Sequence, residues 1–213
     1  MPLTTAILSI SLRENINFID YTKYSMENYA KKIKAEFILI TSWKNFVDKK
    51  SSENRFIKLE IIHFYCKQYD RLIYFDDTVY ITPNCKNLFE LVPENCLGGF
   101  IESKLFNRGG CMANAIKYYS QFDKWDKNSK NILMINSGVM VLSKNHSSLF
   151  DSSNYILKSF GFIDQAFISY QICRQGINMY DITDRYNYCG SQIDKCILNK
   201  NIYIFIISKI FYF

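Results

Sequence analysis

The segment RLIYFDDTVYI, residues 71–81, decides the fold class of this chain. Its first part, residues 71–75, is a short apolar run, which is typical of a strand buried in a sheet. Asp76, Asp77 and Thr78 follow directly where this strand is expected to end. In α/β sheets, ligands bind beyond the carboxyl ends of such strands. The segment therefore predicts an α/β fold with a ligand site at its acidic turn.

Strand-like and helix-like segments alternate on both sides of this run. Short apolar runs predict further strands at residues 4–10, 36–41, 98–101, 132–142, 178–182 and 203–207. Longer stretches predict helices at residues 18–33, 55–69, 88–91, 112–122 and 163–173. The run 132–142 is expected as two halves, because Asn136, Ser137 and Gly138 interrupt it. This alternation predicts a single α/β domain with a central mixed, mostly parallel sheet flanked by helices.

The composition is that of one ordinary globular domain of 213 residues. Hydrophobic residues make up 48% and charged residues 22%, which excludes a disordered, collagen-like or coiled-coil protein. The formal net charge is +6, and the basic residues are spread along the chain. A nucleic-acid partner is therefore not expected. Attraction to an anion such as a nucleotide diphosphate fits this charge better.

The cysteines and histidines do not have the spacing of a metal site. The seven cysteines form no CxxC pair, and the only histidines are His63 and His146. This pattern argues against zinc and favours reduced thiols in a cytoplasmic protein. His63 lies in an apolar helical segment, which predicts a core or partly exposed position. The polar surroundings of His146 predict a solvated position.

Neither end of the chain has the pattern of a secretory or membrane-spanning segment. The N-terminus lacks the basic lead and the long apolar run of a signal peptide. The apolar stretch at residues 202–213 is shorter than the roughly 20 residues that a helical span needs. It is expected to form a buried strand and an apolar tail, with peripheral membrane contact as the alternative. The expected location is the cytoplasm.

The acidic turn is the first candidate site, because two adjacent carboxylates are unfavourable unless a cation lies near them. Oxygen ligands favour Mg²⁺ or Mn²⁺, which usually keep water ligands and share a substrate phosphate. Side chains alternate along an extended chain, so Asp76 and Thr78 are expected to point one way and Asp77 the other. The alternative is a solvated turn that ends the strand.

Two further polar groups have both a structural and a functional interpretation. At the Asn136-Ser137-Gly138 step, glycine permits close backbone approach and asparagine offers hydrogen bonds; the alternative is a turn or bulge. Asp164 and Gln165 begin a predicted helix. There, Asp164 fits N-terminal capping as well as ligand binding.

Four segments resemble GT-A glycosyltransferases, particularly the retaining families 8 and 34. Residues 69–91 are similar to the family's strand, Asp-x-Asp motif and following helix, and residues 131–142 to an element that reads F-N-S-G-V-M-L. Residues 162–172 and 184–188 are similar to a D-Q-x-x-L-N helix start and to a Y-N segment. All four occur in the family's order. The chain also resembles the short, virus-encoded GT-A enzymes that glycosylate capsid protein, which implies the cytoplasm of a host cell.

The resemblance implies a GT-A (Rossmann-like) fold and a sugar transfer reaction. The sugar would move, with retention, from a UDP-sugar (UDP-hexose or UDP-deoxyhexose) to a glycan or protein-linked acceptor. A Mn²⁺ or Mg²⁺ ion at Asp76, Asp77 and Thr78 would bridge the donor phosphates, and one of the two aspartates would meet the sugar. Residues 1–110 would form the nucleotide and metal half, and residues 111–213 the sugar and acceptor half.

The resemblance also implies roles for single residues. Polar and basic residues would contact the donor nucleotide: Ser9, Ser11, Lys58 (with Arg55 as the fallback), Asp77, Ser137 and Gly138. Three residues would act near the transferred sugar: Asn136 and Asp164 at its hydroxyls, and Gln165 near the anomeric carbon. The acceptor side would be lined by Asp184, Tyr186 and Asn187. The alternative for Lys58 is an ordinary exposed helix lysine.

Two departures from the family pattern leave other functions open. Thr78 stands where the family has its second Asp, and the C-terminal metal-binding His of family 8 is absent from the matching apolar stretch. A non-catalytic relative that binds a sugar nucleotide is therefore one alternative. A nucleotidyltransferase that makes sugar nucleotides is another, although residues 6–17 lack the Gly-rich phosphate loop that it needs.

Overall fold

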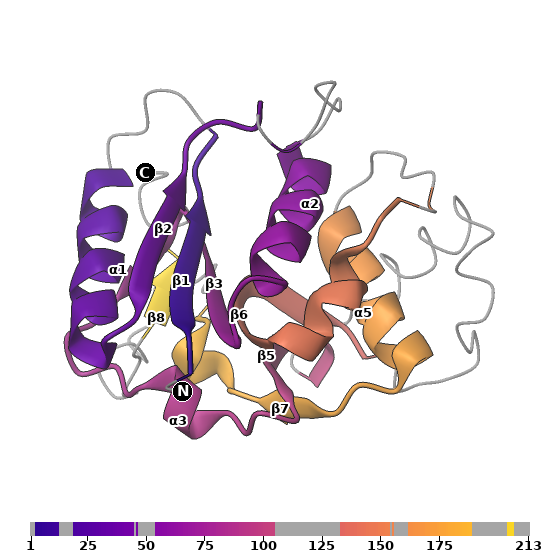
Figure 1. Ribbon diagram of the computed structural model, residues 1–213. Coiled ribbons are helices and arrows are strands. Elements are labelled where there is room, and N and C mark those ends of the chain that lie inside the picture. The colour runs from indigo at the N-terminus through magenta and orange to yellow at the C-terminus, as the bar shows by residue number, and fades with distance from the viewer. Residues whose placement is uncertain are drawn as a thin grey trace, which may run out of the picture.

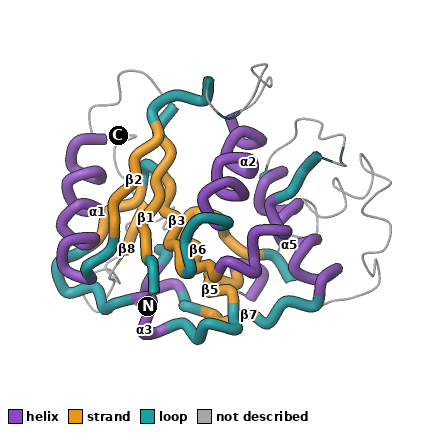
Figure 2. Tube along the Cα trace, viewed as in Figure 1, coloured by secondary structure: helices purple, strands orange, loops and turns teal. Residues whose placement is uncertain are grey.

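The computed structural model describes residues 3–12, 19–44, 46, 54–104, 133–153, 155, 162–188 and 204–206 (Figures 1 and 2). Its strands are β1 (Thr5–Ile10), β2 (Glu36–Ile40), β3 (Arg71–Asp76), β4 (Val79–Ile81), β5 (Leu97–Ile101), β6 (Ile135–Ser143), β7 (Met179–Asp181) and β8 (Ile204–Ile206). Its α-helices are α1 (Ile19–Ile33), α2 (Asn54–Cys66), α3 (Leu88–Leu91) and α5 (Ile163–Gln175). Its 3₁₀ helices are η1 (Glu102–Lys104), η3 (Lys144–Phe150) and η4 (Asp184–Tyr186). The helix predicted at residues 112–122 lies outside the described residues.

The central sheet of the described chain has six strands in the order β2-β1-β3-β6-β5-β7 (Figure 1). β1 lies parallel to β2 and β3, and β5 lies parallel to β7. β6 runs antiparallel to both of its neighbours, β3 and β5. The strands β4 and β8 form a separate antiparallel pair. The predicted mixed, mostly parallel sheet is confirmed, and β8 is the strand expected near the C-terminus.

Helices cover both faces of the central sheet (Figures 1 and 2). On one face, Ile7 of β1 belongs to the same core as Met26 and Tyr29 of α1. On the other face, Leu8 and Ile10 of β1 pack in the core that α2 and α5 cover. Neighbouring residues of β1 therefore face opposite cores, as expected for a strand that is buried on both sides.

The strand β6 departs from the sequence prediction, because residues 135–143 form one strand instead of two halves. Gly99 of β5 pairs with Met140, whereas the next residue, Phe100, pairs with Asn136. The residues between these two partners therefore bulge away from β5. On the opposite edge, the polar step lies just past the last residue of β6 that pairs with β3. A bulge can interrupt pairing in this way without ending the strand.

The prediction of a solvated His146 is wrong. His146 lies in η3, which packs against α2, and is only 1% exposed. Its Nδ1 accepts the backbone N–H of Ser143 at 3.0 Å, so the polar residues around it form a helix start. Burial, and then the nearby Arg71 guanidinium, lower the pKa of His146 to about 4. The imidazole is therefore neutral at pH 7.

Stability at mildly acidic pH is expected to depend on His146. A histidine in the unfolded chain takes up a proton below about pH 6.5, whereas the folded pKa is about 4. Stability is therefore lost as the pH falls between these values, by about 2 kcal/mol from pH 7.5 to pH 5. His146→Gln keeps an acceptor for the Ser143 N–H but does not titrate, so urea unfolding should show a smaller loss. An equal loss in both proteins would contradict the buried, neutral histidine.

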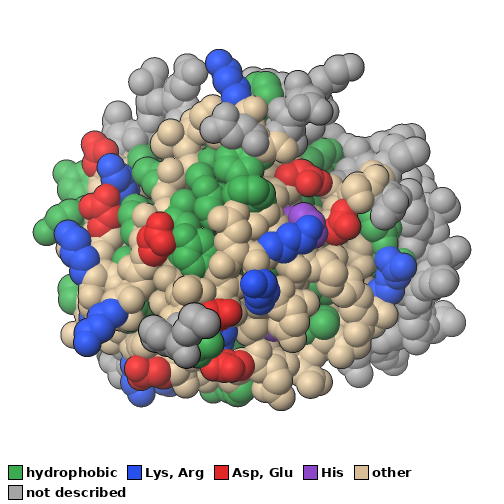
Figure 3. Space-filling model, viewed as in Figure 1, with side chains coloured by type: hydrophobic (Ala, Val, Ile, Leu, Met, Phe, Trp, Pro, Cys, Tyr) green, Lys and Arg blue, Asp and Glu red, His purple; other side chains and the backbone are tan. Residues whose placement is uncertain are grey.

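The described surface has mixed charge. On the face shown in Figure 3, Lys and Arg side chains lie among Asp and Glu side chains, and hydrophobic side chains gather over β1 and β2. The hydrophobic part agrees with the edge strand β2, where residues 37–40 are only partly buried. Within the described ranges, no helix combines the length and hydropathy needed to cross a membrane. Free thiols are found at the described cysteines Cys66, Cys85, Cys96 and Cys173.

Candidate active site

Three parallel strands end at one edge of the sheet. Ile10, the last residue of β1, pairs with Ile40 of β2 and with Asp76 of β3. A pocket of about 260 Å³ lies at this edge, where α/β sheets bind ligands. It is lined by Ile10, Leu12, Lys58, Tyr74, Asp76, Asp77, Ser137, Phe162, Asp164 and Gln165. The acidic turn therefore lies at a pocket, as the sequence predicted.

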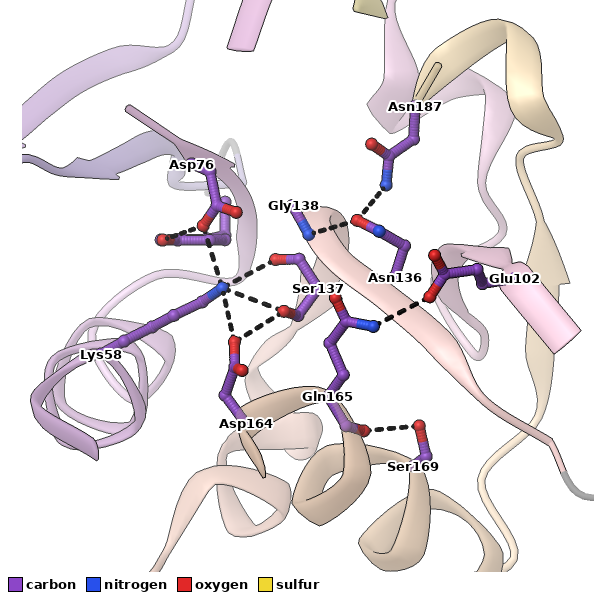
Figure 4. Close-up of polar contacts among 11 residues, drawn as sticks. Lys58, Asp76, Glu102, Asn136, Ser137, Gly138, Asp164, Gln165, Ser169 and Asn187 are labelled. Atoms are coloured by element: carbon purple, nitrogen blue, oxygen red, sulfur yellow. Dashed lines mark hydrogen bonds and ion pairs between the residues drawn. The ribbon is translucent and has the colours of Figure 1, made fainter. Parts of the chain in front are cut away.

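Lys58 of α2 lies at the centre of the polar contacts in this pocket (Figure 4). The residue is 7% exposed, and its Nζ lies 2.9 Å from Asp76 Oδ1 and 3.2 Å from Asp164 Oδ2. Nζ also donates to the backbone oxygen and the hydroxyl of Ser137, at 3.0 and 3.1 Å. One ammonium group therefore connects α2 with β3, β6 and α5. The interpretation of Lys58 as an exposed lysine is wrong.

Lys58 keeps its positive charge although it is buried. Burial lowers the pKa of a lysine, but the carboxylates of Asp76 and Asp164 outweigh that effect and raise the pKa of Lys58. Tyr74 also keeps its proton, because burial and then Asp76 raise the pKa of its phenol. The Tyr74 hydroxyl donates to Asp76 Oδ1 at 2.7 Å. Oδ1 of Asp76 thus accepts two hydrogen bonds, while Oδ2 lies toward Gly138 (Figure 4).

The bulge in β6 brings three side-chain oxygens together beside Gly138. A Cβ at this position would lie 2.9 Å from Asn136 Oδ1, 3.4 Å from Asp76 Oδ2 and 3.5 Å from Asn187 Oδ1. Glycine therefore leaves the space that these groups share. Asn136 Oδ1 accepts from Asn187 Nδ2 and from the Gly138 N–H, both at 2.9 Å. The bulge, expected as a structural alternative, is what gathers this polar group.

Asp164 is not the N-cap residue of its helix. α5 begins after Phe162, which has a left-handed backbone with φ 64° and makes no side-chain cap. The Asp164 side chain instead lines the pocket, where Oδ2 accepts from Lys58 and, at 2.8 Å, from the Ser137 hydroxyl. The N-cap position therefore belongs to Phe162, while Asp164 is the acidic residue of the first turn, where it suits the helix dipole. Its carboxylate also connects α5 with α2 and β6.

Gln165 is held by a residue that sequence reasoning missed. Its Nε2 donates to Glu102 Oε2 at 2.9 Å, and both residues are buried. Its backbone oxygen accepts from the Ser169 hydroxyl at 2.6 Å, and Ser169 in turn accepts the N–H of Ile135 in β6. Glu102 directly follows β5, so the rule that identified Asp76, an acid at the end of a strand, could also have found it.

The serines predicted at the nucleotide lie away from the pocket. Ser9 and Ser11 are buried, and the described pocket lining contains Ile10 and Leu12 in their place. The alternation of side chains along β1 explains this difference, since neighbouring residues face opposite sides of the sheet. Among the described residues, Ser9 Oγ has no hydrogen-bond partner. The side chain of Arg55, the fallback for Lys58, lies outside the described part of the structure.

The predicted alternation at the acidic turn is also wrong. β3 ends at Asp76, and the next two residues, Asp77 and Thr78, form a turn. Both aspartates therefore line the pocket, whereas Thr78 is buried and absent from its described lining. Of the residues predicted at the acceptor side, Asn187 joins the polar group at Gly138, and Tyr186 packs in the core on the α1 side.

The residues at the turn fit a divalent metal only as part of a shared site. No group of three or more His, Cys, Asp or Glu side chains is placed to hold a metal ion in the described part of the chain. Two carboxylates, Asp76 and Asp77, line the same pocket. Mg²⁺ is commonly held by one or two carboxylates together with water and substrate phosphates. The donor set is therefore suitable for an ion that arrives with a phosphorylated ligand.

No family model matches the chain, and no curated protein matches it. Solved structures match over nearly its whole length. A glycosyltransferase involved in the glycosylation of the major capsid of PBCV-1 aligns at 15% identity over 96% of this chain and 93% of its own, with a TM-score of 0.62. Mouse xyloside xylosyltransferase 1 aligns at 14% identity over 96% of this chain and 98% of its own, with a TM-score of 0.54.

The galactosyltransferase LgtC, in complex with donor and acceptor sugar analogs, aligns at 13% identity over 94% of this chain and 86% of its own, with a TM-score of 0.50. At these identities, the likeness concerns the fold. The chain has the α/β fold of these glycosyltransferases, which confirms the fold expected from its resemblance to GT-A enzymes. The expected likeness to a capsid glycosyltransferase is likewise confirmed as a likeness of fold.

Proposed function

We propose that this chain is a metal-dependent glycosyltransferase that moves a sugar from a UDP-sugar to a hydroxyl of a glycan or glycoprotein, with retention. The donor would be a UDP-hexose or UDP-deoxyhexose. The observation that carries the proposal is the charged group of Lys58, Asp76, Asp77 and Asp164 in one pocket at the carboxyl edge of the sheet. The fold shared with three glycosyltransferases supports it.

The donor diphosphate would lie beside the acidic turn. Asp76 and Asp77 would hold a Mn²⁺ or Mg²⁺ ion, which when bound neutralises charge on the leaving diphosphate. Lys58 and Tyr74 fix Asp76 through Oδ1, so Oδ2 is the oxygen for this role. Three aspartates and one lysine line the described pocket, and this excess of negative charge favours a cation.

The transferred sugar would lie between β6 and α5. Asp164 would offer a carboxylate oxygen to its hydroxyls, and Asn136 would hydrogen-bond a further hydroxyl. Gln165 lies next to Asp164 on the first turn of α5. Asn187, which donates a hydrogen bond to Asn136, would line the side where the sugar acceptor binds. In this arrangement, residues 1–110 serve the nucleotide and the metal, and residues 111–213 serve the sugar and its acceptor.

A non-catalytic relative that binds a sugar nucleotide is the second candidate. Two observations favour it: Thr78 is buried, and Asp76 already forms an ion pair with Lys58 at 2.9 Å. Such a protein would bind UDP but would not release UDP from a UDP-sugar. Measuring both properties on the same preparation therefore separates the two candidates.

Calorimetric titration of UDP, with Mn²⁺ and with EDTA, tests the proposed site. We expect Mn²⁺ to tighten UDP binding by about tenfold or more, equivalent to about 1.4 kcal/mol, and Asp76→Asn to remove this gain. Asp70→Asn is the matched control, because Asp70 precedes β3 at the opposite edge of the sheet and accepts hydrogen bonds from Thr4. The control should keep the gain.

The outcomes distinguish the parts of the proposal. Equal UDP affinity in Mn²⁺ and EDTA would contradict the metal. Absence of UDP binding in both conditions would contradict the nucleotide donor. UDP release from UDP-glucose or UDP-galactose in the presence of an acceptor would exclude the non-catalytic candidate, and UDP binding without any release would favour it.

A further inference from the structure

The amide group of Gln165 has a fixed direction in this structure. Its Nε2 donates to Glu102 Oε2 at 2.9 Å, in a place where both side chains are almost fully buried. A carboxylate accepts hydrogen bonds only, so the reversed amide would bring two acceptor oxygens into contact. Burial makes such a mismatch expensive. Oε1 must therefore point away from Glu102, and Figure 4 shows it on the side of Ser137.

Glu102 is itself held on a supported segment. It begins η1, directly after β5. The residues before and after it make hydrogen bonds or ion pairs with other elements. The N–H of Ile101 donates to Asp181 Oδ1 at 3.3 Å, and Lys104 forms an ion pair with the same carboxylate at 2.7 Å. Ser103 exchanges hydrogen bonds with the backbone of Met134, just before β6. The backbone on both sides of Glu102 is therefore anchored to neighbouring elements.

We propose that Glu102 is a positioning residue that presents Gln165 Oε1 to the pocket as a hydrogen-bond acceptor. The substrate group that meets Gln165 must then be a hydrogen-bond donor. On the sugar side of the pocket, where the proposed function places Gln165, that donor is a sugar hydroxyl. A phosphate oxygen is excluded there, because two acceptors would face each other. The pocket is thus divided: Lys58 and a metal serve the diphosphate side, and Gln165 serves the sugar. This inference rests on the proposed function.

Exchanging the two functional groups tests the orientation. Glu102→Gln lets the Gln165 amide turn either way, so we expect UDP release from UDP-glucose to fall about tenfold while UDP affinity stays unchanged. Gln165→Glu brings two carboxylates together, so we expect UDP release to fall by about the same factor. Its activity should recover toward acidic pH. The double variant Glu102→Gln/Gln165→Glu restores an amide donor facing a carboxylate acceptor. We expect it to recover to within about threefold of the wild type.

A control and a second readout keep the test decisive. Glu94→Gln makes the same chemical change at an exposed position before β5 and should leave activity unchanged. A double variant that folds but is no more active than Glu102→Gln would overturn the inference, as would full activity in Glu102→Gln. If the wild type neither binds UDP nor releases it, the proposed function fails, and hydrogen exchange of the ¹⁵N-labelled Gln165 side chain still decides the orientation. Slow exchange that is lost in Glu102→Gln supports it, and equal exchange in both proteins overturns it.

Discussion

Lys58→Met is expected to lower the free energy of unfolding by about 3 kcal/mol and to reduce turnover at least about 100-fold. Methionine has a similar length, so the change removes the charge and its hydrogen bonds and keeps most of the volume. The ammonium group lies between Asp76 and Asp164, and without it two carboxylates on different elements repel each other. Urea unfolding and UDP release from a UDP-sugar measure the two effects.

Lys23→Met is the matched control for this variant. Lys23 forms an i,i+4 ion pair with Glu27 on the exposed side of α1, with 43% of its side chain exposed. Exposed pairs of this kind contribute at most a few tenths of a kcal/mol, so stability and turnover should hardly change. Mn²⁺ should stabilise Lys58→Met more than the wild type, because a divalent cation would compensate the carboxylates that lost their lysine. A loss no larger than that of the control would refute the central role of Lys58.

The fold could be predicted where the pattern is local. The apolar runs that became β1 and β3, and the acidic turn that follows β3, are readable because a strand buried on both faces needs a continuous apolar run. The position of β6 in the sheet cannot be predicted from its own segment. It lies antiparallel between β3 and β5, and its pairs join residues such as Arg71 and Ser143 that are far apart in the chain. Packing decides such pairs, and single segments do not contain them.

The same distinction explains the candidate site. Asn136 and Gly138 stood out because they interrupt an apolar run, and the structure places them at the end of β3. Nothing in the segment around Lys58 distinguishes it from a surface lysine. Its two ion-pair partners, Asp76 and Asp164, lie 18 and 106 positions further along the chain. Glu102 could have been found as an acid at the end of a strand, but its contact with Gln165, 63 positions further along, could not. Burial of a charge is a tertiary property, so the sequence could name these residues one by one but could not show that Lys58 joins Asp76 to Asp164.

Asp164→Asn is expected to reduce turnover about 100-fold, a loss of about 2.7 kcal/mol of transition-state stabilisation, and to destabilise the fold by about 1.5 kcal/mol. Asparagine keeps the shape and can still accept the Ser137 hydroxyl, but it no longer balances the charge of Lys58. Asp20→Asn is the control, since Asp20 is an exposed acid in the first turn of α1. If Asp164 served only the helix dipole, both variants would lose the same few tenths of a kcal/mol and keep their activity.

Combining the two site variants tests whether Asp164 acts through Lys58. In the wild type, Asp164→Asn removes a carboxylate that balances a buried ammonium group, so it is destabilising. In the Lys58→Met background, the same substitution removes a carboxylate that has lost this cation, so it should be neutral or stabilising. The double-mutant cycle should therefore give a coupling energy of about 1.5 kcal/mol or more in urea unfolding. Additive losses would show that the two side chains stabilise the fold independently, and the charged cluster would then not be one unit.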